Sequence, residues 1–206
     1  MRKPKLRELG EAIRAIVRGP VTTKFPFEPH TPPEAFRGLP TFDEEGCIGC
    51  KACAEVCPTH CIDVIDDTAA DPPVRRLVLH YDRCIFCGHC ELNCSTKEGI
   101  RLGAEYDLAC FDRSACVQTV ENELVCCQVC GAVIAPRKQL LFVADQLGAK
   151  RYANPTLILL RHGQIGLCEA DGREATDRPM THESLMQVTC PACRRTLVLR
   201  ELWGQG

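Results

Sequence analysis

Eight of the 17 cysteines in this 206-residue chain stand in two copies of one spacing. The first copy is CIGCKACAEVC at 47–57 and the second is CIFCGHCELNC at 84–94, so each cysteine recurs 37 residues later. Three cysteines at i, i+3 and i+6 can wrap one corner of a cubane [4Fe–4S] cluster through a tight loop. In proteins with two such runs, the fourth cysteine of each run ligates the other cluster. The repeat therefore predicts two [4Fe–4S] clusters that exchange ligands between the copies.

The exchange of the fourth ligand assigns four cysteines to each cluster. The first cluster takes Cys47, Cys50, Cys53 and Cys94, and the second cluster takes Cys84, Cys87, Cys90 and Cys57. Zinc fits this pattern poorly, because a tetrahedral zinc site needs two separated cysteine pairs rather than three cysteines in seven residues. Two copies in register also argue against a disulfide scaffold. We therefore expect two clusters held close together, as an electron relay requires.

The residue after each run differs between the two copies. Pro58 follows the first run, whereas Ser95 follows the second, where bacterial-type runs normally have proline. Serine keeps its backbone N–H and adds a hydroxyl, so we expect one of these groups to donate a hydrogen bond to the Cys94 sulfur. Because hydrogen bonds to sulfur influence the cluster's reduction potential, the substitution predicts a raised potential for the first cluster.

Two further C-x2-C pairs lie near the C-terminus, CQVC at 127–130 and CPAC at 190–193. Together they supply four thiolates, the set of a structural zinc site with no open position. The ligands would be Cys127, Cys130, Cys190 and Cys193. The spacer of 59 residues exceeds the usual ~15–20, and a mononuclear iron, a third cluster or free thiols remain alternatives. Cys126 competes with Cys127, but the C-x2-C-G spacing favours Cys127.

The cysteines outside these sets are expected to be thiols that bind no metal: Cys61, Cys110, Cys116 and Cys168. The odd total of 17 cysteines and the absence of a signal-peptide pattern at the N-terminus favour a reducing compartment over disulfides. No apolar run approaches the ~18 residues that span a bilayer. The sequence also offers no basic patch with interleaved aromatics, no catalytic triad signature and no phosphate-binding loop. We therefore expect a non-catalytic protein that does not bind nucleic acid.

The sequence around the cysteines predicts an α+β chain. Its expected parts are a bacterial dicluster ferredoxin-like fold, an N-terminal amphipathic helix and a C-terminal zinc-ribbon-like extension. A helix is predicted over 137–147, with Gly148 as its stop. Strands are expected at 61–65, 75–81, 99–102, 156–161 and 195–202. Residues 104–125 are expected to be a connector and residues 171–184 a polar loop.

The N-terminal segment precedes the cysteines and has its own character. Residues 4–18 place apolar side chains at helical spacing, and residues 1–24 hold seven basic and two acidic side chains. Such a helix either packs on this chain's own core or lies on a membrane surface or membrane subunit. Residues 20–41 hold six prolines and predict an extended arm. Three domains are expected: a helix with a docking arm at 1–41, a ferredoxin domain at 42–109 and a C-terminal extension at 110–206.

Taken together, RGPVTTKFPFEPHTPPEAFRGLP, CIGCKACAEVCP and CIFCGHCELNC resemble one known family over residues 12–109. This is the eight-iron ferredoxin subunit shared by respiratory complex I and the membrane-bound [NiFe]-hydrogenases of the formate hydrogenlyase and Ech kind. The trailing AEYDLA, CQVC and CPAC are more similar to the formate hydrogenlyase version. Ser95 and the long C-terminal spacer depart from the family pattern.

The resemblance implies an electron-transfer subunit. It implies a relay through two [4Fe–4S] clusters between an electron-input module and the small hydrogenase subunit, with the large hydrogenase subunit and a membrane arm as further partners. It places the protein peripherally on the cytoplasmic face of the cytoplasmic membrane, with residues 4–18 against the membrane arm. A complex I-type subunit and a free soluble dicluster ferredoxin are the alternatives. The C-terminal cysteine pairs disfavour the first alternative, and the N-terminal helix and arm disfavour the second.

Overall fold

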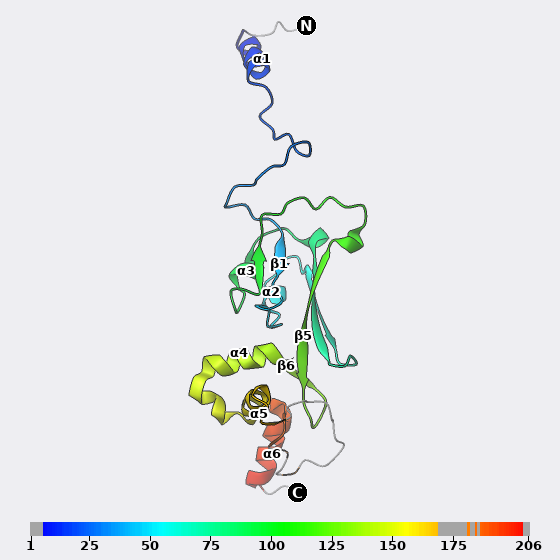
Figure 1. Cartoon of the computed structure of the whole chain (residues 1–206), viewed down its shortest axis with the longest axis vertical. Helices are drawn as coiled ribbons and strands as arrows, with labels where there is room; N and C mark the ends of the chain where they lie inside the picture. The colour runs from blue at the N-terminus through cyan, green and yellow to red at the C-terminus, as the bar shows by residue number, and fades with distance from the viewer. Residues whose placement is uncertain (1–5, 169–180, 182–183, 185, 204–206) are drawn as a thin grey trace. The chain divides into compact units, whose positions relative to one another are not determined.

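The computed structural model describes residues 6–168, 181, 184 and 186–203 (Figure 1). The chain divides into two compact units, Met1–Phe36 and Arg37–Gly206. The polar loop expected at 171–184 lies outside the described residues, apart from positions 181 and 184. Among the described helices, none is long and apolar enough to cross a membrane.

The first unit contains one helix, α1 (Leu6–Arg18), which confirms the predicted N-terminal helix. None of its 13 residues is buried. The apolar stripe is therefore open to solvent: Leu6 is 88% exposed and Ile16 is 82% exposed. Because this helix and the core belong to different units, both interpretations of the helix remain predictions.

The second unit begins with the two cysteine runs and the short elements around them. Strand β1 (Pro40–Phe42) pairs antiparallel with β4 (Ile100–Leu102), and β2 (Ile62–Asp67) pairs antiparallel with β3 (Val74–His80). Helix α2 (Ala52–Glu55) lies within the first run and α3 (His89–Leu92) within the second. Short 3-10 turns include η1 (Tyr81–Arg83), η2 (Arg113–Ala115) and η3 (Gly148–Ala153). The strands predicted near 61–65, 75–81 and 99–102 are confirmed.

The expected connector over 104–125 is wrong in its second half, which forms the ten-residue strand β5 (Val117–Cys126). Strand β5 pairs with β3 on one side and with β6 (Val133–Pro136) on the other, so the sheet order is β2-β3-β5-β6. Its inward positions alternate, with Val120 2%, Asn122 2% and Leu124 3% exposed. This period of two is typical of a strand with one buried face. Figure 1 shows β5 as the long strand that leads from this sheet toward helices α4 to α6.

The C-terminal part is helical where two strands were expected. Helix α4 (Arg137–Leu147) confirms the predicted helix, but 156–161 lies in α5 (Pro155–Gln164) and 195–202 in α6 (Pro191–Trp203). The Asn154 side chain caps α5 by accepting a hydrogen bond from the Thr156 N–H at 3.1 Å. Proline occupies the first turn of both helices, where its missing N–H costs nothing. The expected zinc-ribbon-like extension therefore has helices in place of these strands.

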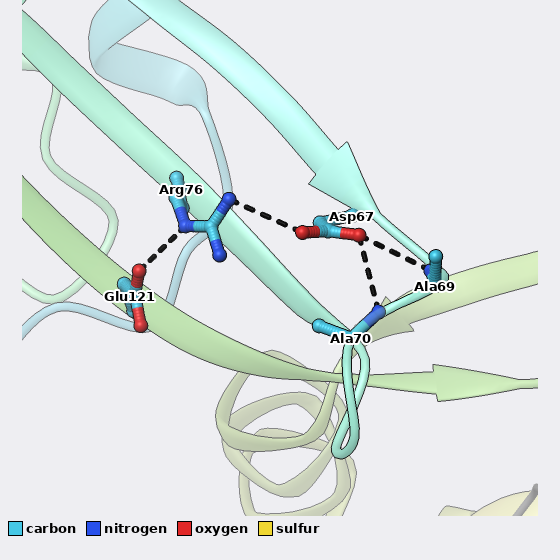
Figure 2. A network of polar contacts seen from close by, with 5 residues as sticks. All are labelled: Asp67, Ala69, Ala70, Arg76 and Glu121. Atoms are coloured by element: carbon cyan, nitrogen blue, oxygen red, sulfur yellow. Dashed lines mark hydrogen bonds and ion pairs between the residues drawn. The ribbon is translucent and has the colours of Figure 1, made fainter.

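On one face of the β2-β3-β5 sheet, charged side chains of neighbouring strands form hydrogen bonds with one another (Figure 2). Arg76 on β3 donates to Glu121 on β5 at 2.6 Å and to Asp67 on β2 at 3.2 Å. Asp67 in turn accepts hydrogen bonds from the N–H groups of Ala69 and Ala70, each at 3.1 Å. The opposite face packs into the core, where Leu77 and Leu79 are each 1% exposed. The sheet therefore presents an apolar face to the cysteine runs.

Candidate metal centres

The two cysteine runs line two separate cavities, each open to solvent on one side. Counted with that solvent, the first cavity holds about 300 Å³ of space free of protein atoms, and it is lined by Cys47, Cys50, Cys53 and Cys94. The second holds about 370 Å³ and is lined by Cys84, Cys87, Cys90 and Cys57, together with Cys61. Each cavity thus brings together three cysteines of one run and the fourth cysteine of the other. These are the two ligand sets that the spacing predicts.

The pKa values of the buried cysteines indicate whether their thiolates could exist in these cavities without a bound metal. Burial, together with the neighbouring Cys47, Cys50 and Cys90, raises the pKa of the Cys53 thiol to about 12. Burial likewise raises the pKa of Cys90 to about 11. Thiolates are the form that ligates a metal, and four of them in one small cavity need a cation to offset their repulsion. The donor sets and the cavities therefore fit [4Fe–4S] clusters.

Hydroxyl groups lie beside several of these sulfurs. The Ser95 Oγ lies 3.4 Å from the Cys50 Sγ, whereas the Thr96 Oγ1 lies 3.4 Å from the Cys94 Sγ. The predicted Ser95–Cys94 contact is therefore wrong, because the chain turns after Cys94 and presents Thr96 to it instead. Both cysteines line the first cavity, so the Ser95 hydroxyl still reaches a sulfur of the predicted first-cluster set.

The loop of the first run is held by a buried arginine. Arg75 is 9% exposed and donates to both carboxylate oxygens of Asp66, at 2.6 and 2.8 Å. Its third hydrogen bond goes to the carbonyl of Gly49 at 3.1 Å. Gly49 has a φ of +66°, a conformation that favours glycine. Arg75 thus ties the strand β3 to the cysteine loop, and the sequence analysis did not single it out.

Cys61 is a further thiol that lines the second cavity. It is 2% exposed, and its Sγ lies 3.3 Å from the Cys57 Sγ. Its backbone N–H also donates to the Cys57 Sγ at 3.4 Å. Burial raises the pKa of Cys61 to about 12, with the Cys57 contact as the next cause. Cys61 is therefore a protonated neighbour of the second ligand set.

The four C-terminal cysteines converge from two elements. The Sγ atoms of Cys127, Cys130, Cys190 and Cys193 all lie within 4.8 Å of one another. The first pair follows β5 and the second pair stands at the start of α6. Burial raises the pKa of Cys127, but N–H donors led by the one of Cys190, 3.3 Å from its Sγ, outweigh burial and lower it to about 7. Such a thiolate is well suited to bind a metal.

The other cysteines lie apart from these groups. Cys126 ends β5 and is not part of the four-sulfur group. Cys168 donates its Sγ–H to the Leu159 carbonyl at 3.4 Å. Cys110 and Cys116 face each other across η2 with their Sγ atoms 2.8 Å apart, and Cys110 is exposed. Nothing in the sequence indicated that Cys110 and Cys116 lie together, whereas the structure places their thiols side by side.

Comparison with known proteins extends this picture. The 4Fe-4S dicluster domain family matches residues 46–98, the range that holds both cysteine runs. Formate hydrogenlyase subunit 6 of Escherichia coli is 30% identical over 182 residues, which cover 88% of this chain and 86% of that protein. NADH-quinone oxidoreductase subunit I 2 of Geobacter metallireducens is 31% identical over 127 residues, which cover 59% of this chain and 96% of that protein.

Two further matches are shorter. NAD(P)H-quinone oxidoreductase subunit I of Gloeobacter violaceus is 34% identical over 109 residues, and the match spans about half of each protein, 51%. Among solved structures, one chain of the membrane-bound sulfane sulfur reductase, an archaeal respiratory membrane complex, is 28% identical. That match covers 55% of this chain and 60% of the other, with a TM-score of 0.40.

The matched domain and the two cysteine-lined cavities define an iron–sulfur protein of the 4Fe–4S dicluster class. More closely, the chain belongs to the family that includes formate hydrogenlyase subunit 6 and subunit I of NADH-quinone oxidoreductase. The family resemblance predicted from the sequence is thereby confirmed.

Proposed function

We propose that this chain is a non-catalytic electron-transfer subunit that carries electrons between an electron-input module and the small subunit of a membrane-associated [NiFe]-hydrogenase complex. The observation that carries the proposal is the pair of cavities, each lined by three cysteines of one run and one of the other. When bound, the two [4Fe–4S] clusters supply two one-electron carriers side by side. The protein's own residues hold them, exclude water and set their potentials.

The extent of the matches favours the hydrogenlyase type over complex I. The formate hydrogenlyase subunit aligns with 88% of this chain, whereas the two quinone oxidoreductase subunits align with 59% and 51%. A match over 88% has to include part of the C-terminal region that carries the cysteine pairs. A complex I-type subunit remains the second candidate, on the strength of those two relatives.

Metal analysis with single-cysteine variants tests the ligand exchange. Anaerobically purified protein is expected to contain eight iron atoms per chain, and four would contradict two clusters. Cys94→Ala is expected to damage the cluster held by the first run, and Cys57→Ala the cluster held by the second. Electron paramagnetic resonance follows the two signals separately. Damage to the cluster of the variant's own run would show that each run binds its cluster alone.

We also propose that the C-terminal four-cysteine group binds one structural zinc. Four thiolates with no open position suit a structural rather than a catalytic ion. One zinc per chain is expected in addition to the iron. Iron in place of zinc, or no metal at this group, would contradict the assignment.

We further propose that α1 docks on a membrane-embedded subunit of the complex and so keeps this chain peripheral at the cytoplasmic face of the membrane. The helix exposes a stripe of apolar side chains beside Arg7, Arg14 and Arg18, a composition typical of helices at a membrane interface. Removing residues 1–18 is expected to release the chain from its complex without loss of iron. Continued association of the shortened chain would refute this role.

The variants Ile13→Ser and Arg14→Ser separate the two contributions of α1. Loss of association with the first variant and retention with the second would assign the docking to the apolar stripe, since Arg14 forms only an exposed pair with Glu11 at 2.9 Å. A free soluble ferredoxin would behave alike in both variants and would copurify with no partner subunit.

A further inference from the structure

One polar side chain is buried beside the first cluster's loop without belonging to either cysteine run. Asn122 lies on β5, beyond the 46–98 range of the dicluster domain. It is 2% exposed, and its Nδ2 lies 3.8 Å from the Cys47 Sγ. Among the described residues its Oδ1 is buried without a hydrogen-bond partner.

The buried Asn122 amide lowers the stability of the fold relative to an apolar side chain at the same position. A buried carbonyl oxygen without a partner costs roughly 1–3 kcal/mol, and the neighbouring inward positions of β5 are filled by Val120 and Leu124, which carry no such cost. The amide's N–H donors point to a sulfur that is a thiolate when it ligates a metal. Donors to such sulfurs are among the features by which a protein sets a cluster's reduction potential.

The backbone of the first run leaves room for this contact. A Cβ on Gly49 would lie 3.0 Å from the Asn122 Cβ and 3.0 Å from the Pro136 Cγ, closer than ordinary packing allows. The β5–β6 hairpin therefore lies directly on the cysteine loop at Gly49. A second tie joins the same regions, because the Lys138 Nζ donates to the Glu44 carbonyl at 2.5 Å.

We propose that Asn122 is a positioning residue of the first cluster, donating a hydrogen bond to the Cys47 sulfur and raising that cluster's reduction potential. The C-terminal extension would then act on the first cluster as well as on its own four-cysteine group, because the β5–β6 hairpin presents Asn122 to the loop and carries Cys127 and Cys130 in its turn. The inference rests on the proposed binding of the first cluster by Cys47, Cys50, Cys53 and Cys94.

The second cluster receives no comparable side chain from β5. The hydroxyl beside its ligand set is that of Thr59, 3.6 Å from the Cys57 Sγ, and it comes from the cysteine run's own flank. A change at Asn122 is therefore expected to act on one cluster only. This selectivity separates a local effect on the sulfur from general damage to the fold.

The experiment measures both cluster potentials by electron paramagnetic resonance at a series of poised potentials in the full-length protein. Asn122→Leu keeps the side-chain size and removes the donor, and Asn122→Asp keeps the shape and replaces the donor with a carboxylate. Both variants are expected to shift the first cluster's potential in the negative direction, Asn122→Asp further than Asn122→Leu, with the second cluster unmoved. The Cys94→Ala and Cys57→Ala variants identify which signal belongs to which cluster.

Thr119→Val is the matched control, because Thr119 is an exposed neutral residue on the same strand. It is expected to leave both potentials unchanged. Unshifted potentials in both Asn122 variants, with eight iron atoms still bound, would overturn this inference and leave the proposed function intact. Equal shifts of both clusters would also overturn it. Fewer than eight iron atoms in the wild-type protein would instead refute the proposed function.

Discussion

Replacing Arg75 is expected to loosen the first cluster while sparing the second. Arg75→Met keeps the aliphatic stem and removes two charge-assisted hydrogen bonds to Asp66 and one to the buried Gly49 carbonyl. Loss of a partner from a buried polar group costs roughly 1–3 kcal/mol, and charged partners cost more. The Asp66 side chain is 32% exposed and can regain water, which limits the total. We expect about 2–3 kcal/mol of destabilisation at the loop.

The measurable consequence is faster loss of iron. If iron leaves through local opening of the cysteine loop, a tenfold change in the opening equilibrium corresponds to about 1.4 kcal/mol. The variant should therefore release the first cluster's iron to a chelator roughly 30- to 150-fold faster than wild type. Absorbance reports the total loss, and paramagnetic resonance reports which cluster is lost. Purification with only the second cluster bound would be the limiting form of the same result.

Arg76→Met is the matched control on the adjacent position of β3. Arg76 forms partly exposed ion pairs with Glu121 and Asp67 on the other face of the sheet (Figure 2). Exposed pairs of this kind contribute little, so the control should release iron at nearly the wild-type rate. Equal acceleration in the two variants, or equal loss of both clusters in Arg75→Met, would refute the assigned role of Arg75.

Three further outcomes are expected. Ser95→Ala should lower the reduction potential of the first cluster, because its hydroxyl lies 3.4 Å from the Cys50 sulfur; an unshifted potential would make the serine neutral. Cys190→Ser should remove zinc while leaving eight iron atoms per chain, and a parallel loss of iron would contradict separate sites. Excess oxidised glutathione should join Cys110 and Cys116 in a disulfide with release of two reduced glutathiones, seen by mass spectrometry after alkylation; two alkylated thiols at these positions would exclude it.

The cysteine groups could be predicted because their types and spacing are local properties of the sequence. The C-x2-C-x2-C-x3-C repeat predicts the cysteines that line each cavity, and the C-terminal pairs predict the four-sulfur group. The contacts around the sulfurs depend on how the chain turns after each run. Ser95 therefore faces Cys50 rather than Cys94, and no spacing rule distinguishes the two.

The elements that the sequence failed to predict have identifiable physical causes. In β5 the alternation of inward side chains is interrupted by Asn122, so only Val120 and Leu124 mark the buried face. In 156–161 a short apolar run fits either a strand or a buried helix. The signal that decides it is Asn154-Pro155, a cap followed by proline at the first helical position.

The pairing of β3 with β5 has a consequence for how the chain folds during synthesis. Until residue 126 has been made, the whole side of β3 that will meet β5 is an open edge with unpaired backbone N–H and C=O groups. That edge belongs to the strand VRRLVLH, whose leucines form one apolar face, and open edges of this kind favour pairing with other chains. The charges of Arg75 and Arg76 disfavour such pairing until β5 has been made. A fragment ended at residue 109 would keep every iron ligand and is expected to aggregate, whereas one ended after β6 would close the sheet.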